Sequence, residues 1–193
     1  MPAEPPVPNR PHFAFLVAAL GFGVPATPAL AAAPSAGHCT APAYRQFDFW
    51  LGDWDTYRVD TAGKVPPGAP SVARNRVTAI LGDCVLHEVY RRTDGYTGES
   101  FTIYDATRHV WHQSWVTNEG ELLVAEGGRH GQAIVLTGAS RDAQGPQLQR
   151  VSWTPQGDGV RETALQSRDG GKTWTPLFDI LFRPHPHRAA ASR

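Results

Sequence analysis

Apolar and polar residues alternate through most of the chain after residue 52, in short runs that turn-forming residues separate. A period of two is typical of β-strands that bury one face and expose the other. No stretch after residue 52 shows ten or more residues with the 3.6-residue period of an amphipathic helix. The pattern therefore predicts ten strands, at 53–60, 73–81, 84–92, 98–105, 109–117, 120–126, 131–138, 147–154, 159–167 and 174–183.

The links between these strands are short and rich in Gly, Pro, Asn and Asp, as at Asp94-Gly95 and Gly157-Asp158-Gly159. Evenly spaced short strands with tight links predict an all-β fold, a single antiparallel up-and-down β-barrel of eight to ten strands. Ten strands make a slightly wider barrel than eight, with room for a small ligand. A β-sandwich is the rival, and pairing between the first and last strands distinguishes the two.

The stretch before the first strand holds five aromatic residues within residues 47–57. Its apolar half, residues 47–51, predicts a short turn of helix that plugs one end of the barrel. Gly52 then permits a sharp change of direction, and the first strand begins.

A short helix followed by Gly-x-Trp, here Gly52 and Trp54, resembles the beginning of lipocalin-like (calycin) barrels. The resemblance implies that Trp54 closes the barrel floor and that a basic residue of the last strand, here Arg183, packs across it. The wider run, Phe47–Asp55 with Cys84-Val85-Leu86-His87-Glu88 and Trp111-His112-Gln113-Ser114-Trp115, resembles more closely a family of secreted bacterial lipocalin-like proteins of unknown function. That resemblance covers roughly residues 39–183. It implies a barrel of the lipocalin, fatty-acid-binding or nitrobindin type and says almost nothing about activity.

The first 31 residues have the pattern of a secretory signal peptide. Arg10 and His12 precede an apolar run at 13–24, and Ala29-Leu30-Ala31 is a plausible cleavage site. An uncleaved anchor is the alternative. The expected organisation is a signal peptide at 1–31, a flexible leader at 32–42, the barrel at 43–184 and a disordered tail at 185–193, in a periplasmic or secreted protein.

Export changes the interpretation of the two cysteines, Cys39 and Cys84, which are the only ones in the chain. An oxidising compartment favours a disulfide between them, and two free buried thiols are the alternative.

The charge balance limits the kinds of partner. The chain has 18 basic and 18 acidic residues and is 41% hydrophobic, which suits one globular domain. A net charge of zero argues against nucleic acid and against an anionic membrane as partners, and once the signal is removed no membrane association is expected. The sequence leaves the oligomeric state open.

The segment 167–174 reads Ser-Arg-Asp-Gly-Gly-Lys-Thr-Trp and matches the turn called the Asp-box. Asp169 can accept hydrogen bonds from loop N–H groups, and Trp174 can pack beneath the loop. Propellers that use this turn carry several copies, so one copy predicts a structural hairpin between the last two strands and not a glycosidase.

The sequence lacks the usual catalytic, cofactor-binding and metal-binding motifs, including H-E-x-x-H, G-x-S-x-G, a phosphate-binding glycine loop and a cysteine cluster. It therefore favours a protein that is not an enzyme and predicts no cofactor and no metal. Alternation instead places polar and aromatic residues on the inward faces of the strands. On the fourth strand, Phe101 and Ile103 are as good inward candidates as Ser100 and Tyr104. The candidate ligand-binding residues are Glu88, Tyr90, Tyr104, Trp111, Gln113, Trp115 and Trp153.

The favoured function is the binding of a small apolar or aromatic molecule inside the barrel. One alternative is an enzyme that uses Glu88 as a general acid or base, for which a second titratable residue beside Glu88 would be the sign. Another is a structural or interaction barrel with a filled core, in which Glu88 pairs with Arg150 or Arg161. A third is a haem-binding, nitrobindin-like barrel, although alternation places the candidate ligands His87 and His112 on the outer face. The remaining histidines available for this role are His109 and His130.

Overall fold

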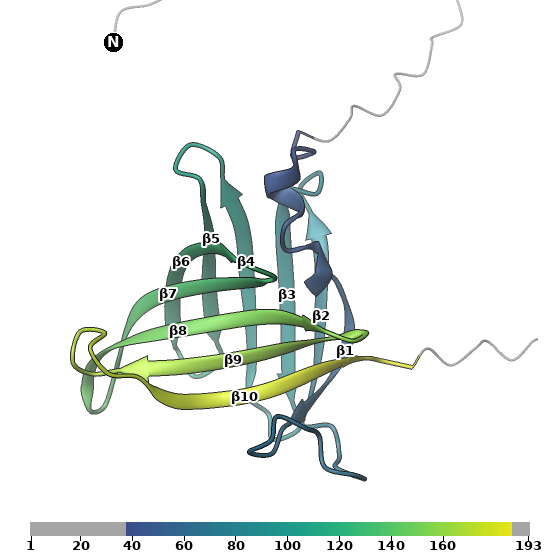
Figure 1. Cartoon of the computed structure of the whole chain (residues 1–193), viewed down its shortest axis with the longest axis vertical. Coiled ribbons are helices and arrows are strands. Elements are labelled where there is room, and N and C mark those ends of the chain that lie inside the picture. The colour runs from purple at the N-terminus through teal and green to yellow at the C-terminus, as the bar shows by residue number, and fades with distance from the viewer. Residues whose placement is uncertain (1–37, 187–193) are drawn as a thin grey trace, which may run out of the picture. The chain divides into compact units, whose positions relative to one another are not determined.

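The computed structural model describes residues 38–186, and the predicted signal peptide therefore lies outside the described residues. Residues 38–186 form a closed barrel of ten antiparallel strands, in which each strand pairs with the next along the chain (Figure 1). The strands are β1 Gly52–Arg58, β2 Ala73–Ile80, β3 Val85–Arg92, β4 Thr97–Asp105, β5 Val110–Thr117, β6 Leu122–His130, β7 Ala133–Asp142, β8 Gly145–Gln156, β9 Gly159–Ser167 and β10 Thr175–Pro184.

The first and last strands close the barrel. Trp54 lies opposite Pro184, and Asp55 lies opposite Arg183, in an antiparallel ladder between β1 and β10. This pairing confirms the predicted up-and-down barrel and is incompatible with a sandwich. The fold is consistent with a lipocalin-like barrel. Within the described residues, no helix has both the length and the apolar character needed to span a membrane.

The strand β4 shows how the side chains divide between the two faces. Ser100 and Thr102 are completely buried inside the barrel, whereas Phe101 and Ile103 lie outside with 49% and 37% of their surfaces exposed. The sequence did not decide which face of β4 points inward, and the structure shows that it is the polar face. The apolar residues of β4 point away from the interior, so the barrel does not follow the simple rule of apolar residues inside.

A short plug, defined here as residues 42–50, fills one end of the barrel. It consists of two 3₁₀ turns, η1 (Pro42–Arg45) and η2 (Asp48–Trp50). The Phe47 and Trp50 rings are fully buried, with their centroids 5.0 Å apart, and both pack on Trp153 of β8. The indole N–H of Trp54 donates to the carbonyl oxygen of Trp50 at 3.1 Å, which fixes the plug to the start of β1. The predicted helical plug is thus confirmed.

The expected contact between Trp54 and Arg183 is wrong. Trp54 points inward and is buried, whereas Arg183 is exposed on the outer face, where its guanidinium lies 5.3 Å from the centre of the Tyr57 ring. The register explains the difference. The residue opposite Trp54 is Pro184, and its neighbour Arg183 points to the other face of the sheet because side chains alternate along a strand.

The disulfide between Cys39 and Cys84 confirms the predicted pairing and joins the segment before the plug to the link between β2 and β3. That link contains Leu81 and Asp83 with φ values of 52° and 64°, so it turns sharply through the left-handed region. Arg45 of η1 donates to the carbonyl oxygen of Asp83. The plug is therefore held by a covalent bond as well as by its aromatic packing.

The hairpin between β9 and β10 has the structure that the Asp-box pattern predicts. The carboxylate of Asp169 accepts from the hydroxyl of Thr173 at 2.6 Å and from the N–H groups of Thr173 and Lys172 at 2.9 and 3.0 Å, and these bonds lower the pKa of Asp169 to about 2. The indole N–H of Trp174 donates to Gly171, and the Arg150 guanidinium lies 4.0 Å from the centre of the Trp174 ring.

The contacts of the barrel continue one residue past β10. The backbone N–H of His185 donates to the carbonyl oxygen of Asp53 at 2.8 Å, and its ring lies 2.9 Å from the carboxylate of Asp55. The last part of the expected tail, residues 187–193, lies outside the described residues.

We predict that the native protein has no free thiol. Alkylation without reduction should leave the intact mass unchanged, and alkylation after reduction should label two cysteines. Replacing both Cys39 and Cys84 by Ser should lower the free energy of unfolding by up to about 4 kcal/mol, because the disulfide closes a loop of 45 residues that is otherwise free in the unfolded chain. Labelling of two thiols before reduction would contradict the pairing.

Candidate functional site

The interior of the barrel has a filled half and an open half. Around the plug, Trp50, Trp111 and Phe182 are fully buried in one apolar cluster. Beyond this cluster lies a cavity of about 920 Å³, which we call the barrel cavity. It extends to the loops at the end opposite the plug, where its lining includes Tyr96 and Glu119. We call this end the mouth.

The wall of the barrel cavity combines aromatic and aliphatic side chains with about as many polar and charged ones. Tyr90 of β3 and Trp115 of β5 meet edge to face, with their ring centroids 6.2 Å apart. Trp153 of β8 lies at the inner end, where the cavity meets the plug. Leu123 and Val151 add buried aliphatic surface. Such a wall suits an apolar or aromatic molecule.

Glu88 projects into this cavity from the centre of β3, where alternation places it on the inward face between Leu86 and Tyr90. Its carboxylate accepts hydrogen bonds from Asn75 Nδ2 at 2.9 Å and from Ser100 Oγ at 2.8 Å. Burial raises the pKa of Glu88 to about 7, against the opposing effect of these two hydrogen bonds.

Further polar side chains hold this arrangement in place. The amide group of Gln113 donates to Thr102 Oγ1 at 3.0 Å and more weakly to Ser100 Oγ at 3.4 Å. The hydroxyl of Ser100 in turn donates to Glu88. The inward polar residues of β4 and β5 thus form a network that orients the carboxylate, which explains why β4 buries its polar face.

Glu162 is the second acidic residue of the cavity and was not among the predicted site residues. It lies on β9 between the buried residues Val160 and Ala164, so it points inward, and its neighbours across the sheet are Trp153 and Ile180. Burial is the main reason that its pKa lies well above the ordinary value, and the negative charge of Glu88 raises it further. The indole N–H of Trp153 favours the ionised form of Glu162, but its position does not meet the geometry of a hydrogen bond to the carboxylate.

Neither acid is neutralised by the arginines that the sequence offered as partners. Arg161 points outward and makes a two-pronged contact with Asp179, in which Nε lies 2.9 Å from Oδ1. Arg150 covers Trp174. The hypothesis that Glu88 pairs with Arg150 or Arg161 is therefore wrong, and the interior holds two carboxyl groups that influence each other's pKa.

Five of the seven predicted ligand-binding residues line the barrel cavity, namely Glu88, Tyr90, Gln113, Trp115 and Trp153. The other two, Trp111 and Tyr104, lie instead in the filled half. Trp111 packs edge to face on Phe47, and its indole N–H donates to Gln46, while Tyr104 packs on Trp111. Alternation identified the inward face correctly, but depth along the strand decides whether an inward residue meets the plug or the cavity.

Charged residues of both signs surround the mouth. Arg92 contacts Asp94 and lies over the ring of Tyr96, and the hydroxyl of Tyr96 donates to Glu121 at 2.9 Å. Burial and Glu121 raise the pKa of Tyr96 to about 12. The charged side chains that line the mouth are Arg58, Arg92, Arg141, Asp94, Glu119, Glu121 and Asp142.

The histidines considered as haem ligands lie outside the barrel cavity. His87 lies 2.8 Å from Glu99 and stacks on Phe101, and His112 lies 2.8 Å from Glu126. His109 and His130 are exposed. Within residues 38–186 no histidine lines the cavity, so the site does not fit a haem held by an axial histidine.

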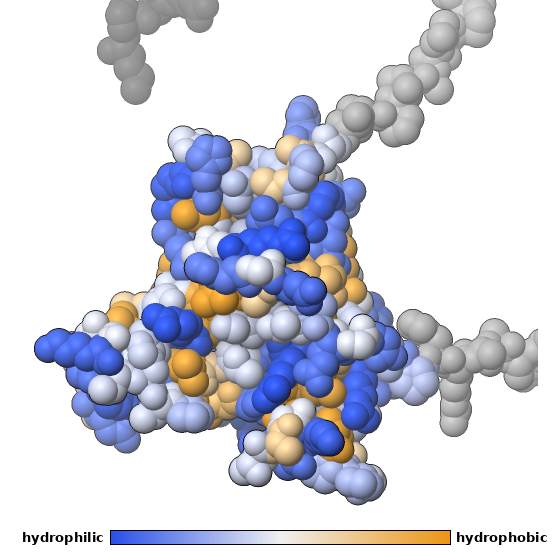
Figure 2. Space-filling view, viewed as in Figure 1, coloured by the Kyte–Doolittle hydropathy of each residue, from blue (hydrophilic) through white to orange (hydrophobic). Residues whose placement is uncertain are grey.

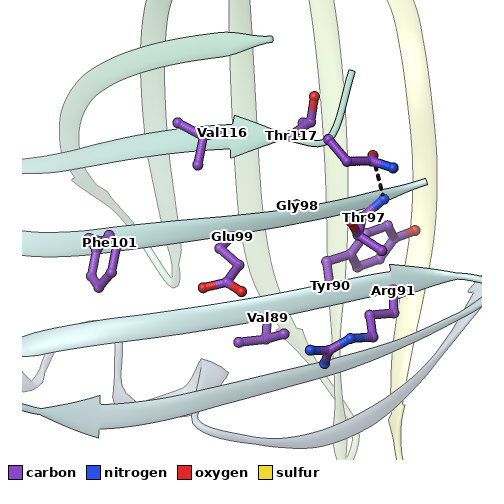
Figure 3. Close-up of a pocket in the computed structure, with 10 residues that line it drawn as sticks. Val89, Tyr90, Arg91, Thr97, Gly98, Glu99, Phe101, Val116 and Thr117 are labelled. Atoms are coloured by element: carbon purple, nitrogen blue, oxygen red, sulfur yellow. Dashed lines mark hydrogen bonds between the residues drawn. The ribbon is translucent and has the colours of Figure 1, made fainter. Parts of the chain in front are cut away.

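A second, smaller hollow of about 300 Å³ lies on the outer surface of β3, β4 and β5. Figure 3 shows Val89, Glu99 and Phe101 standing on neighbouring strands beside it, with the N–H of Thr97 bonded to Asn118. On the face shown in Figure 2, hydrophobic residues occur in small groups among hydrophilic ones. The outer hollow has no buried charged group in its lining, and the barrel cavity is therefore the stronger candidate site.

We predict that the free energy of unfolding falls between pH 5 and pH 8. In this range the unfolded chain has already released the proton of Glu88, whose ordinary pKa is 4.5, whereas the folded protein retains it up to a pKa of about 7. The difference destabilises the fold by on the order of 3 kcal/mol as the pH rises. Glu162 acts in the same direction, because its pKa is also raised.

Chemical unfolding at several pH values tests this prediction. A variant with both Glu88→Gln and Glu162→Gln should lose most of the fall. Glu99→Gln, which removes an acid from the outer face, should retain it. Curves that are parallel for the wild type and the double variant would show that the two acids are not buried as the structure has them.

No protein-family model matches this chain, and no curated protein sequence matches it.

Proposed function

We propose that this protein is a binding barrel that holds a small apolar or aromatic molecule in its interior. The observation that carries the proposal is the barrel cavity of about 920 Å³, which lies in the upper part of the range for small-molecule sites. Its wall combines aromatic rings with polar groups, some of which hydrogen bonds orient, and this composition suits selective burial of a ligand. A structural barrel with a filled core is less well supported, because only the half around the plug is filled.

We further propose that the protein acts outside the cytosol, in the periplasm or after secretion. The disulfide between Cys39 and Cys84 supports this location, because such bonds persist in oxidising compartments. The signal-peptide pattern of residues 1–31 points the same way.

Two adjacent residues of β6 allow a matched test of interior binding. Leu123 is buried and lines the cavity, whereas Val124 points outward, is 41% exposed and does not line it. Leu123→Trp should fill part of the cavity and weaken binding of the neutral probe N-phenyl-1-naphthylamine by about tenfold, or about 1.4 kcal/mol. Val124→Trp should bind the probe as the wild type does. The measurement is the rise in probe fluorescence on titration.

Equal binding by the two variants would place the probe outside the barrel. A broader screen uses the emission of Trp115 and Trp153, which would report any molecule in the cavity. If no compound of a metabolite and lipid panel changes this emission, and native mass spectrometry finds no co-purified molecule, the binding function is rejected.

A second candidate function, an acid–base enzyme, is favoured by one specific observation, the presence of Glu162 in the same cavity as Glu88. With a pKa of about 7, Glu88 is a suitable general base near neutral pH, and Glu162, whose pKa burial and the charge of Glu88 raise well above its ordinary value, is a hydrogen-bond donor when it is protonated. Such a pair could move a proton at a carbon next to a carbonyl group. Binding alone remains the better-supported function, because Glu88 is hydrogen-bonded to Asn75 and Ser100 and not to Glu162.

The enzyme hypothesis predicts exchange of hydrogen for deuterium. Carbonyl compounds that bind to the wild type should gain deuterium at the carbon next to the carbonyl when they are incubated with the protein in D₂O, as NMR would show. Glu88→Gln should remove the exchange, while Glu99→Gln should not. If no bound carbonyl compound exchanges faster than it does without protein, this second function is rejected.

A further inference from the structure

We propose that the ligand is a small organic cation, in which an ammonium group on an apolar or aromatic body is held by Glu88 and Glu162. This inference rests on the proposed binding function and names the chemical class of the ligand. It is argued from the polar groups of the cavity, from its aromatic rings and from the position of the nearest positive charges.

Several acceptors inside the barrel lack a donor, although the indole N–H of Trp153, which also lines the cavity, lacks an acceptor. Among residues 38–186, no side chain or backbone group donates a hydrogen bond to Glu162. Asn75 Oδ1 and Gln147 Oε1 are also buried acceptors without a partner in the described residues, and Gln147 lines the cavity. Glu88 has one hydrogen bond to each oxygen, and a carboxylate can accept about four. A ligand with several N–H donors would satisfy these groups.

Within residues 38–186, no basic side chain forms an ion pair with either acid. Asn75, Ser100 and Tyr90 surround Glu88, while Trp153 and Ile180 flank Glu162. The positive charges of the cavity lining are Arg58, Arg92 and Arg141, which all lie on the part of their strands nearest the mouth. Arg92 is already paired with Asp94. Once these acids ionise, the interior therefore carries negative charge that an incoming cation can neutralise.

The mouth does not oppose such a cation. Its three arginines are accompanied by four acids, Asp94, Glu119, Glu121 and Asp142, of which Asp142 is paired with Arg168. Inside, the rings of Tyr90, Trp115 and Trp153 offer both apolar contact and the π faces that attract ammonium groups. An anion would meet the uncompensated acids and the same rings without any favourable charge.

The arrangement also predicts how affinity depends on pH. A cation binds best when Glu88 is ionised, and the pKa of Glu88 in the empty cavity is raised to about 7. Binding below this pH must therefore release a proton. If binding requires the ionised form, the affinity should rise about 30-fold between pH 5.5 and pH 8. Tyr90 remains neutral over this range, because burial and Glu162 raise its pKa.

Isothermal titration calorimetry with matched probes tests the proposal. The probes are 2-phenylethylammonium and 2-(1-naphthyl)ethylammonium, each with its neutral alcohol and with the corresponding arylacetate. We expect the ammonium compounds to bind at least tenfold more tightly than the alcohols at pH 8, and the arylacetates to bind weakest. At pH 6 the ammonium compounds should release close to one proton, measured in buffers of different ionisation enthalpy.

Variants separate the acids from the rest of the cavity. Glu88→Gln should remove the proton release and most of the pH dependence, and Glu162→Gln should weaken ammonium binding, while both leave the alcohols largely unaffected. Glu99→Gln is the matched control on the outer face. The comparison of ammonium with alcohol on the wild type needs no variant, so it holds even if a variant fails to fold.

The outcomes distinguish failure of this inference from failure of the proposed function. If alcohols bind as tightly as ammonium compounds, and without proton release, the cavity binds neutral molecules and the inference is overturned while the binding function stands. If arylacetates bind best, the cavity prefers an anionic ligand and the inference is overturned. If none of the probes and none of the panel compounds binds, both the inference and the binding function are rejected.

Discussion

The packing of the plug into one end of the barrel determines what the remainder of the interior can do. Phe47 and Trp50 fill the space between Trp111, Trp153 and Phe182, and the disulfide at Cys39 holds their chain segment in place. A ten-stranded barrel is too wide for inward side chains alone to fill it throughout. Because the plug fills only one half, the other half remains a cavity that extends to the loops at the opposite end.

The polar interior of β4 and β5 is the second constraint. Burying Ser100, Thr102 and Gln113 would destabilise the barrel if their hydrogen bonds were not satisfied, and each instead takes part in the network that orients Glu88. The apolar residues of β4, Phe101 among them, are displaced to the outer surface as a consequence. At this position the barrel therefore buries less apolar surface, and its polar interior holds the carboxylate of Glu88 in a fixed orientation.

Local pattern was sufficient for the strands, the plug and the hairpin at Asp169, because alternation, aromatic clustering and turn residues are properties of neighbouring positions. It was insufficient for the site. Trp111 and Trp115 share a face, yet one meets the plug and the other the cavity. Glu162 could have been recognised from the small apolar residues Val160 and Ala164 on either side of it, but its proximity to Glu88 depends on barrel closure, which brings β3 and β9 to face one interior. The position of Arg183 likewise depended on register.

The two acids of the cavity have a consequence for the empty protein. Each carboxyl group raises the free energy of the folded state when it ionises, since burial removes water and neither receives a protein cation. A fold could avoid this penalty by replacing either acid with an apolar residue of similar volume. A bound molecule that supplies the missing donors or charge would reverse the penalty and stabilise the barrel in proportion to its affinity. The same groups that weaken the empty barrel near neutral pH are therefore those through which a ligand can strengthen it. This coupling links the hydrogen-bond network around Glu88 to the proposed binding function.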